Sequence, residues 1–299
     1  GPCYPKSLMV GVFAGLAHCG TAILALSIFW SNQLVERTLI EIPNQSDWVI
    51  QITDDGSRTL LNPASGIAFH SASGALAETL HVYLENSGVG EKLRQGIEVQ
   101  VIEVGLGTAL GMLVTIDHAL SNRAALRYHA YECNLLDWEV IKLLQFEQHL
   151  QNPWIVDDFL DWIRELGDRI PSGKYRWTPG RRIGARAESS ELEDSAPVSP
   201  VPEVTITLGD CVTELEHDRT LADAIYYDPF APVANPELWT VEAFQRAKSC
   251  LKPGGLLTTY CVSRLVRERF LAAGFEVERV RGPVGGKREV LIACNPERS

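Results

Sequence analysis

A glycine-rich turn between two apolar segments is the first feature of this sequence that indicates chemistry. The turn reads V-I-E-V-G-L-G-T-A over residues 101–109, and the pattern predicts an apolar helix over residues 108–120. Glycine lets the backbone approach a ligand closely, and a helix N-terminus presents N–H groups to it. Position 110 is Leu, so the last glycine of the dinucleotide pattern G-x-G-x-x-G is missing, and no P-loop motif is present. The turn alone leaves two interpretations, a ligand site or a tight strand–helix connection.

Acidic residues stand at the ends of the next three predicted strands. Glu132 ends the second strand, 27 residues after Gly105, where a carboxylate can accept both hydroxyls of a ribose. Asp210 follows the third strand and Asp228 ends the fourth. Ligands of open α/β sheets bind outside the carboxyl ends of the strands, so these acids are expected to converge on one crevice. Taken singly, each acid is equally consistent with a solvated or helix-capping carboxylate.

The segment D-P-F-A-P at residues 228–232 is the predicted reaction centre. Two prolines and an aromatic residue form a rigid wall, and Asp228 supplies a hydrogen-bond acceptor within it. Such a group suits a substrate amine that approaches a methyl donor. The alternative is a strand–helix loop that the prolines merely stiffen.

Six motifs occur in the order found in one known family. They are E-V-G-L-G-T-A at 103–109, Y-E-C at 131–133, L-G-D at 208–210, D-P-F-A-P-V-A-N-P-E-L-W at 228–239, L-K-P-G-G at 251–255 and G-G-K-R-E at 285–289. The chain thereby resembles, over roughly residues 48–294, the methyltransferase part of the bacterial tRNA 5-methylaminomethyl-2-thiouridine biosynthesis proteins (MnmC). The preamble is similar too, in D-D-G at 54–56, E-T at 78–79 and V-Y-L-E-N-S-G at 82–88.

The resemblance implies methyl transfer from S-adenosyl-L-methionine to the aminomethyl group of a wobble uridine in tRNA, without a metal. It implies that Glu132 holds the ribose, Asp210 the adenine amino group, and the glycines of the turn the amino-acid moiety. Asp228 is expected to orient the amine and to assist its loss of a proton. The implied cofactor-binding residues are Glu103, Gly105, Gly107, Thr108, Glu132 and Asp210, and the implied catalytic residues are Asp228, Pro229 and Phe230.

Three departures from the family pattern carry expectations of their own. Ala109 stands where the family usually has a third glycine, which is expected to tighten the cofactor turn. Pro229 stands where the family often has Gly. Five residues follow Cys294, so no counterpart of the FAD-dependent oxidase part of the two-domain members is expected.

The charge is acidic overall but unevenly distributed. The chain has 299 residues with 27 Lys and Arg against 38 Asp and Glu, a net −11, which argues against a general nucleic-acid binder. Residues 174–186 nevertheless carry five basic residues and no acid, with Tyr175 and Trp177 between them, a composition that suits phosphate contact and base stacking. Residues 264–288 carry seven basic residues against three acids. The candidate tRNA contacts are Lys174, Arg176, Arg181, Arg182, Lys287 and Arg288; the alternative for both segments is a solvated face.

The seven cysteines argue against a zinc site, because no two of them form a C-x-x-C pair. An odd number of scattered thiols fits a reducing compartment better than a disulfide framework, so a cytoplasmic location is expected.

The elements that must position these residues follow an α/β order. Strands are predicted over residues 99–104, 126–131, 204–208, 224–227 and 255–260, and helices, one of them over residues 138–150, separate them. Two further strands, 275–280 and 289–293, close the chain. This order predicts a mostly parallel sheet with one antiparallel strand. The resemblance implies that this sheet has the Rossmann-like fold of the class I S-adenosylmethionine-dependent methyltransferases. Residues 97–299 are interpreted as this domain, with a mobile acidic loop at 188–203, and residues 32–96 as a small α+β extension.

The N-terminal segment, residues 1–31, is apolar and has a separate interpretation. Residues 9–30 carry no formal charge over 22 positions, which is long enough to span a bilayer. The segment is interpreted as a membrane anchor, a targeting segment, translated upstream sequence or an element packed on the domain.

Two rival functions stay open at this stage. One is a methyltransferase for small amines on the same fold, since a fold does not fix the substrate. The other is a relative that binds S-adenosylmethionine without turnover, although the acids at 132, 210 and 228 argue against it.

Overall fold

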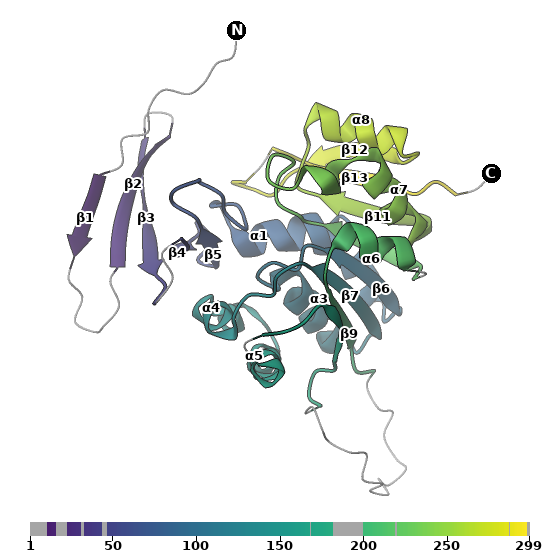
Figure 1. Ribbon diagram of the computed structural model, residues 1–299, viewed down its shortest axis with the longest axis horizontal. Helices are drawn as coiled ribbons and strands as arrows, with labels where there is room; N and C mark the ends of the chain where they lie inside the picture. The colour runs from purple at the N-terminus through teal and green to yellow at the C-terminus, as the bar shows by residue number, and fades with distance from the viewer. Residues whose placement is uncertain are drawn as a thin grey trace, which may run out of the picture. The chain divides into compact units, whose positions relative to one another are not determined.

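A computed structural model describes residues 11–15, 23–30, 33–43, 47–167, 169–181, 200–218, 220–286 and 288–297 (Figure 1). The chain divides into two compact units, Gly1–Ala75 and Leu76–Ser299. Two predicted tRNA contacts, Arg182 and Lys287, lie outside the described residues, as do residues 188–199 of the predicted acidic loop.

The first unit is an antiparallel sheet whose strands pair in chain order. The strands are β1 (Gly11–Gly15), β2 (Ile23–Trp30), β3 (Gln33–Glu41), β4 (Val49–Ile52) and β5 (Arg58–Leu61). The D-D-G segment at 54–56 forms the turn between β4 and β5, where Gly56 has φ +82°. The described parts of residues 9–30 are therefore strands, and within the described ranges no helix is long and apolar enough to cross a membrane.

The second unit is built on an eight-stranded sheet in the order β12-β13-β11-β10-β6-β7-β9-β8 (Figure 1). Five strands, from β11 through β10, β6 and β7 to β9, are parallel neighbours, whereas β13 is antiparallel to β11 and β12, and β8 is antiparallel to β9. The strands are β6 (Val99–Val104), β7 (Leu126–Glu132), β8 (Gly173–Trp177), β9 (Glu203–Leu208), β10 (Ala222–Tyr227), β11 (Leu251–Thr259), β12 (Glu276–Arg281) and β13 (Glu289–Cys294).

Two groups of helices accompany this sheet. Helix α3 contacts α2, η1 and α5, whereas α7 contacts α6 and α8. Crossovers between parallel strands are right-handed. Because the chain moves from the central strands first in one direction and later in the other, the two groups of helices cover opposite faces of the sheet. The helical segments are α1 (Ala75–Thr79), the π-helix η1 (Leu80–Glu85), α2 (Val89–Arg94), α3 (Leu110–Ser121), α4 (Trp138–Leu143), η2 (Phe146–His149), α5 (Trp154–Leu166), α6 (Cys211–His217), η3 (Pro236–Trp239), α7 (Val241–Ser249) and α8 (Arg264–Ala272).

The core explains why these segments fold as they do. Strand β6 is central and covered on both faces, so Val99, Val101, Ile102 and Val104 are all buried. Under α7 and α8 the rings of Phe244 and Phe270 stack at 3.8 Å, which ties these helices together.

The predicted Rossmann-like fold is confirmed, including the antiparallel strand near the C-terminus, β13. Three details differ from the expectations. Strand β8 is a second antiparallel strand within a segment interpreted only as a basic surface. The helix expected over 138–150 ends at Leu143, because Gln145 adopts a left-handed conformation with φ +54°. Residues 76–96, assigned to the extension, lie in the second unit, since η1 and α2 pack against α3.

The topology marks one place for a ligand. The chain begins this sheet at β6, adds β7 and β9 on one side, and then returns to place β10 on the other side of β6. The carboxyl ends of β6 and β10 therefore flank the point where the strand order reverses, which is where open α/β sheets bind ligands.

Candidate cofactor and active site

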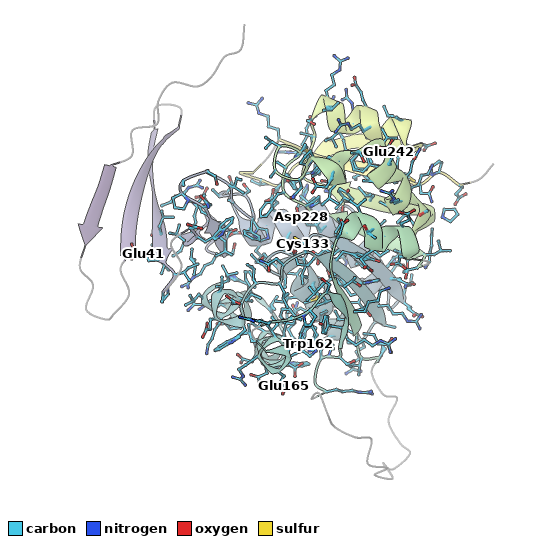
Figure 2. The ribbon with its side chains drawn as sticks, viewed as in Figure 1. Glu41, Cys133, Trp162, Glu165, Asp228 and Glu242 are labelled. Carbon is cyan, nitrogen blue, oxygen red and sulfur yellow. The ribbon has the colours of Figure 1, made fainter. Side chains whose placement is uncertain are left out.

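The acids that follow the strands meet at the carboxyl edge of the sheet, as predicted. The parallel register sets Val104 beside both Tyr131 and Tyr227, so Gly105, Glu132 and Asp228 follow neighbouring strands at one level. Asp228 and Cys133, the residue after Glu132, are labelled at this edge in Figure 2.

The glycine turn is locked against the end of β10. Gly105 has φ +89°, and a Cβ added there would lie 2.8 Å from the carbonyl oxygen of Asp228. The Asp228 amide donates to the carbonyl of Val104 at 2.9 Å, so the two strand ends are bonded to each other. Only glycine fits this position, because both the conformation and the close approach exclude a side chain.

Glu132 is held by the turn itself. Its Oε2 accepts a hydrogen bond from the Gly107 amide at 3.0 Å, and its Oε1 accepts one from the Asn134 amide at 2.9 Å. The half-buried carboxylate therefore has a fixed orientation beside the glycine turn.

Glu103 and Thr108 contribute buried polar atoms beside the same turn. Glu103 Oε2 and Thr108 Oγ1 have no hydrogen-bond partner within the part of the chain that the structure describes. Burial, and then the charge of Asp228, raises the pKa of the Glu103 carboxyl well above its usual range. Burial therefore favours the protonated form of Glu103, in which it can donate a hydrogen bond.

The residues after the turn show how the backbone accommodates Ala109 in place of the family's third glycine. Ala109 adopts φ +66°, a left-handed conformation that costs an L-residue about 1–2 kcal/mol. Gly111, two residues later, leaves room for Glu103, because a Cβ there would lie 2.5 Å from Glu103 Oε1. The sequence pattern pointed to positions 109 and 110 and missed Gly111.

Asp210 lies where it was expected but also has a structural task. It is the N-cap of α6, and its carboxylate accepts from the Val212 amide at 3.1 Å and from Thr213 Oγ1 at 2.8 Å. The adenine contact assigned to Asp210 stays a prediction.

Two tyrosines that received no role from the sequence contact the predicted reaction centre. The hydroxyl of Tyr83, in the π-helix η1, donates to Asp228 Oδ1, and the hydroxyl of Tyr260 donates to the Pro229 carbonyl at 3.0 Å. Burial, reinforced by the charge of Asp228, raises the pKa of both phenols, so both stay protonated donors. Tyr83 lies in the family-like segment at 82–88. Because 145 residues separate it from Asp228, the sequence pattern does not indicate the contact between them.

Hydrogen bonds hold both ends of the loop that follows Asp228. Trp239 Nε1 donates to the Phe230 carbonyl at 2.8 Å, and Arg269 donates to the Trp239 carbonyl at 2.7 Å. Pro229 and Trp239 are buried, and the rigid wall expected of the prolines stays a prediction.

The basic segment on β8 leads away from this site. Gly173 pairs with Leu208 at the carboxyl edge, whereas Trp177 pairs with Val204 toward the opposite edge. Lys174, Arg176 and Arg181 are exposed. The stacking role expected of Trp177 is wrong: its side chain is buried against Phe159, and its Nε1 donates to Asp158 Oδ2 at 2.9 Å.

Arg288 lies on the other side of the site. It is exposed and precedes β13, whose first residue, Glu289, pairs with Arg281 at the end of β12.

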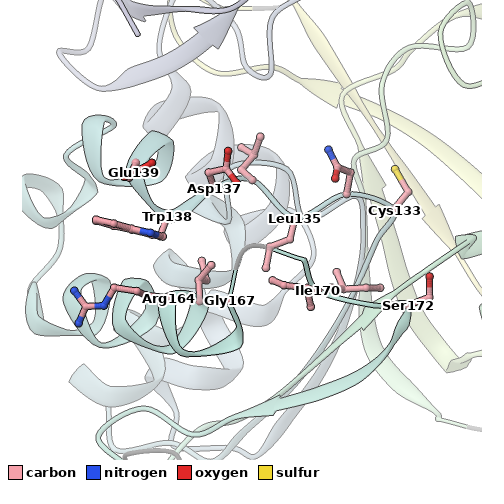
Figure 3. A pocket seen from close by; sticks show the side chains of 13 residues that line it. Cys133, Leu135, Asp137, Trp138, Glu139, Arg164, Gly167, Ile170 and Ser172 are labelled. Carbon is pink, nitrogen blue, oxygen red and sulfur yellow. The ribbon is translucent and has the colours of Figure 1, made fainter. Parts of the chain in front are cut away.

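A pocket of about 190 Å³ lies beyond Glu132, over the β7–β9 side of the sheet (Figure 3). Cys133, Trp138, Arg164 and Ser172 are among its lining residues, and none of the predicted catalytic or cofactor-binding residues is. No group of three or more His, Cys, Asp or Glu side chains suited to a metal ion occurs among the described residues.

Comparisons with known proteins agree with this geometry. Residues 191–296 match the family described as S-adenosyl-L-methionine-dependent methyltransferase. The bifunctional tRNA 5-methylaminomethyl-2-thiouridine biosynthesis protein MnmC of Cupriavidus metallidurans is 30% identical over 247 residues, covering 81% of this chain and 33% of the relative. The MnmC of Burkholderia multivorans is 26% identical over 249 residues, covering 80% of this chain and 33% of the relative. The crystal structure of MNMC2 from Aquifex aeolicus, at 23% identity, covers 86% of this chain and 73% of its own with a TM-score of 0.61, and so confirms the fold.

The fold, the glycine turn with its acids and the family match define this chain as an S-adenosyl-L-methionine-dependent methyltransferase. It is related to the methyltransferase part of the MnmC proteins, as its motifs predicted. The chain spans about a third of the length of these two relatives.

The residues at the turn fit the cofactor of that class. S-adenosyl-L-methionine carries ribose hydroxyls, an amino-acid moiety and a positively charged sulfur. Glu132 offers an oriented carboxylate, and Glu103 and Thr108 offer buried oxygens that lack partners within the described ranges. These three residues would hold the group.

Proposed function

We propose that this protein methylates the aminomethyl group of a wobble uridine in tRNA and so forms the methylaminomethyl group. The observation that carries the proposal is Asp228, whose carboxylate is held by Tyr83 at the carboxyl edge beside the glycine turn. The relatives named for 5-methylaminomethyl-2-thiouridine biosynthesis support the choice of substrate.

The chemistry sets what the site must do. Bound S-adenosyl-L-methionine supplies an electrophilic methyl group, and its sulfur keeps the electron pair of the broken S–C bond. An alkylamine is mostly protonated at neutral pH, judging from the lysine pKa of about 10.4, and only the neutral form has a lone pair to form the new N–C bond.

Asp228 meets both requirements of the amine. A carboxylate attracts the ammonium form, aligns the nitrogen by a hydrogen bond and accepts the proton that must leave. The donor hydroxyl of Tyr83 holds Oδ1 and thereby sets the plane of the carboxylate. Alignment of this kind supplies several kcal/mol of the barrier reduction, up to about 7–11 kcal/mol in well-oriented systems.

Buried walls keep the reacting nitrogen in place. Pro229 is buried, and the Tyr260 hydroxyl fixes its carbonyl. The loop up to Trp239 is hydrogen-bonded at both ends. The aminomethyl group of the substrate therefore meets a rigid surface rather than a mobile loop.

Nucleoside mass spectrometry tests the substrate. tRNA that carries aminomethyluridine is incubated with the protein and S-adenosyl-L-methionine, digested and compared with an untreated sample. A gain of one methyl group on that nucleoside is expected. If this gain is absent and free primary amines are methylated, the proposal is wrong and the protein is a methyltransferase for small amines.

A further inference from the structure

Arginine side chains beside β12 and β13 lie at the same edge of the sheet as the proposed reaction centre. Strand β13 runs antiparallel to β11, with Leu291 opposite Thr259, so the start of β13 lies level with Tyr260. Arg281 ends β12 opposite Glu289. The hairpin that joins β12 to β13 therefore rises at the carboxyl edge.

Hydrogen bonds connect this hairpin to Asp228 through a single helical turn. His81 Nε2 donates to the Arg281 carbonyl at 2.7 Å. Two residues further along η1, Tyr83 donates to Asp228. The π-helix η1 thus contacts the base of the hairpin at one residue and the reaction centre at another.

The charges at the hairpin are available to an anionic ligand. Arg279 is paired with Glu289 at 3.0 Å and contributes little net charge. Arg281 and Arg288 are exposed, and their side chains form no ion pair with any residue that the structure describes. The hairpin is closed by a hydrogen bond from the Gly282 amide to the Arg288 carbonyl at 2.8 Å, so both arginines stand on a defined turn.

Arg176 and Arg181 lie farther from the carboxyl edge than Lys174, which pairs with Thr207 near that edge. Arg176 pairs with Thr205 in the middle of β9, and Arg181 follows Trp177 toward the amino edge of the sheet. They are exposed as well, but the register directs them away from Asp228.

We infer that the β12–β13 hairpin, through Arg281 and Arg288, is the surface that contacts the phosphate backbone of the substrate RNA. The inference rests on the proposed function. Guanidinium groups bind phosphate in two-point contacts, and a contact at this edge keeps the nucleotide to be modified within reach of Asp228. The β8 arginines are not part of that surface.

The test compares two double variants with equal changes in charge. Arg281→Gln/Arg288→Gln removes the proposed contacts, and Arg176→Gln/Arg181→Gln is the matched control on β8. Binding of a fluorescent anticodon stem–loop RNA is measured by anisotropy from low to moderate salt. Affinity for S-adenosyl-L-methionine and the melting temperature report on the fold of each variant.

The hairpin variant is expected to bind the RNA at least about fivefold more weakly, with a salt slope reduced by about 2, because two phosphate contacts are lost. The control is expected to match the wild type, and cofactor affinity is expected to be unchanged in both.

Three outcomes overturn the inference: equal RNA binding by the hairpin variant and the wild type, a larger loss in the β8 variant, or loss of cofactor binding together with RNA binding. Methyl transfer to the RNA is measured separately. If the wild type methylates the RNA and the hairpin variant binds the RNA as well as the wild type does, only the inference is refuted. If the wild type neither binds nor methylates the RNA, the proposed function is refuted as well.

Discussion

At the scale of single residues, the reaction centre depends on a contact between distant parts of the chain. The Asp228 carboxylate receives a hydrogen bond from Tyr83, whose ring lies 5.4 Å from that of Tyr226 in a buried aromatic group. We therefore expect Tyr83 to position the carboxylate.

Replacement of Tyr83 by Phe should lower kcat about tenfold or more while the KM for S-adenosyl-L-methionine stays constant. A hydrogen bond to a charged group contributes about 1.5–3 kcal/mol, and this one orients the carboxylate. Steady-state kinetics with the RNA substrate measure the effect. Tyr226→Phe is the control, because it removes a buried hydroxyl 3.3 Å from Thr115 and leaves the Asp228 contact intact. Equal kcat values for the two variants would contradict the role of Tyr83.

A second buried carboxylate, Asp218, sets the response of stability to acid. Burial alone would raise its pKa, but hydrogen bonds from His129, Thr220 and Tyr131 outweigh burial and lower the pKa well below the usual value. The folded protein therefore binds this proton more weakly than the unfolded chain does. The resulting stabilisation is complete above the unfolded pKa of about 3.9 and is lost as the pH falls toward the folded pKa.

Asp218→Asn should consequently destabilise the second unit by about 1–3 kcal/mol at pH 7, because the network loses its charged acceptor. The melting temperature of the wild type should fall more steeply than that of the variant below about pH 4. Parallel slopes for the two proteins between pH 6 and pH 3 would show that Asp218 does not make this contribution.

At the scale of elements, the turn between β6 and α3 packs against the end of β10, so it would fix the distance between the proposed cofactor region and the proposed reaction centre. Gly105 should tolerate no side chain, since a Cβ would lie 2.8 Å from the Asp228 carbonyl. Gly105→Ala is expected to lower methyl transfer about 100-fold, the size of loss that a displacement of about 1 Å produces.

Gly96→Ala is the matched control for that turn. Gly96 also has a positive φ, +70°, but nothing lies within 4 Å of its Cβ position. The control should lose about 1 kcal/mol of stability and keep its activity. Activity assays and melting curves distinguish the two variants, and full activity in Gly105→Ala would refute the close approach.

Strand β8 belongs to the core, although its exposed residues are basic. Trp177→Ala should cost about 3–5 kcal/mol of unfolding free energy, because its ring is buried against Phe159 and Trp162. Arg176→Ala, one residue away and exposed, should stay within about 0.5 kcal/mol of the wild type. Urea unfolding measures the unfolding free energy of both variants. A small effect of Trp177→Ala would contradict the buried position of this residue.

The sequence predicted the strand-end acids because their positions follow from local pattern and one topological rule. Gly105, Glu132 and Asp228 lie together because parallel strands end at one edge, and each strand was visible as an apolar run. The alternation of exposed Lys174 and Arg176 with Tyr175 and buried Trp177 has the period of a strand, but the basic residues drew attention to binding instead. The Tyr83 contact and the space that Gly111 leaves for Glu103 depend on packing between elements, which spacing along the chain does not encode.

At the scale of the whole molecule, net charge was a weaker guide than the placement of charge. The chain carries a net −11, yet Arg281 and Arg288 lie exposed at the edge that holds Asp228. We therefore expect two functions to be separate in the second unit: the β6 and β7 ends would bind the cofactor, and the β10 end with its surroundings would bind the amine.

Substitution of Asp228 by Asn tests this separation most directly, with cofactor binding by calorimetry and methyl transfer to tRNA measured on the same preparation. We predict that the affinity of the variant for S-adenosyl-L-methionine stays within about twofold of the wild type and that methyl transfer falls at least about 100-fold, within the range attributed to positioned acid–base groups. Methyl transfer at the wild-type rate with intact cofactor binding would contradict the assignment of Asp228 as the residue that handles the amine.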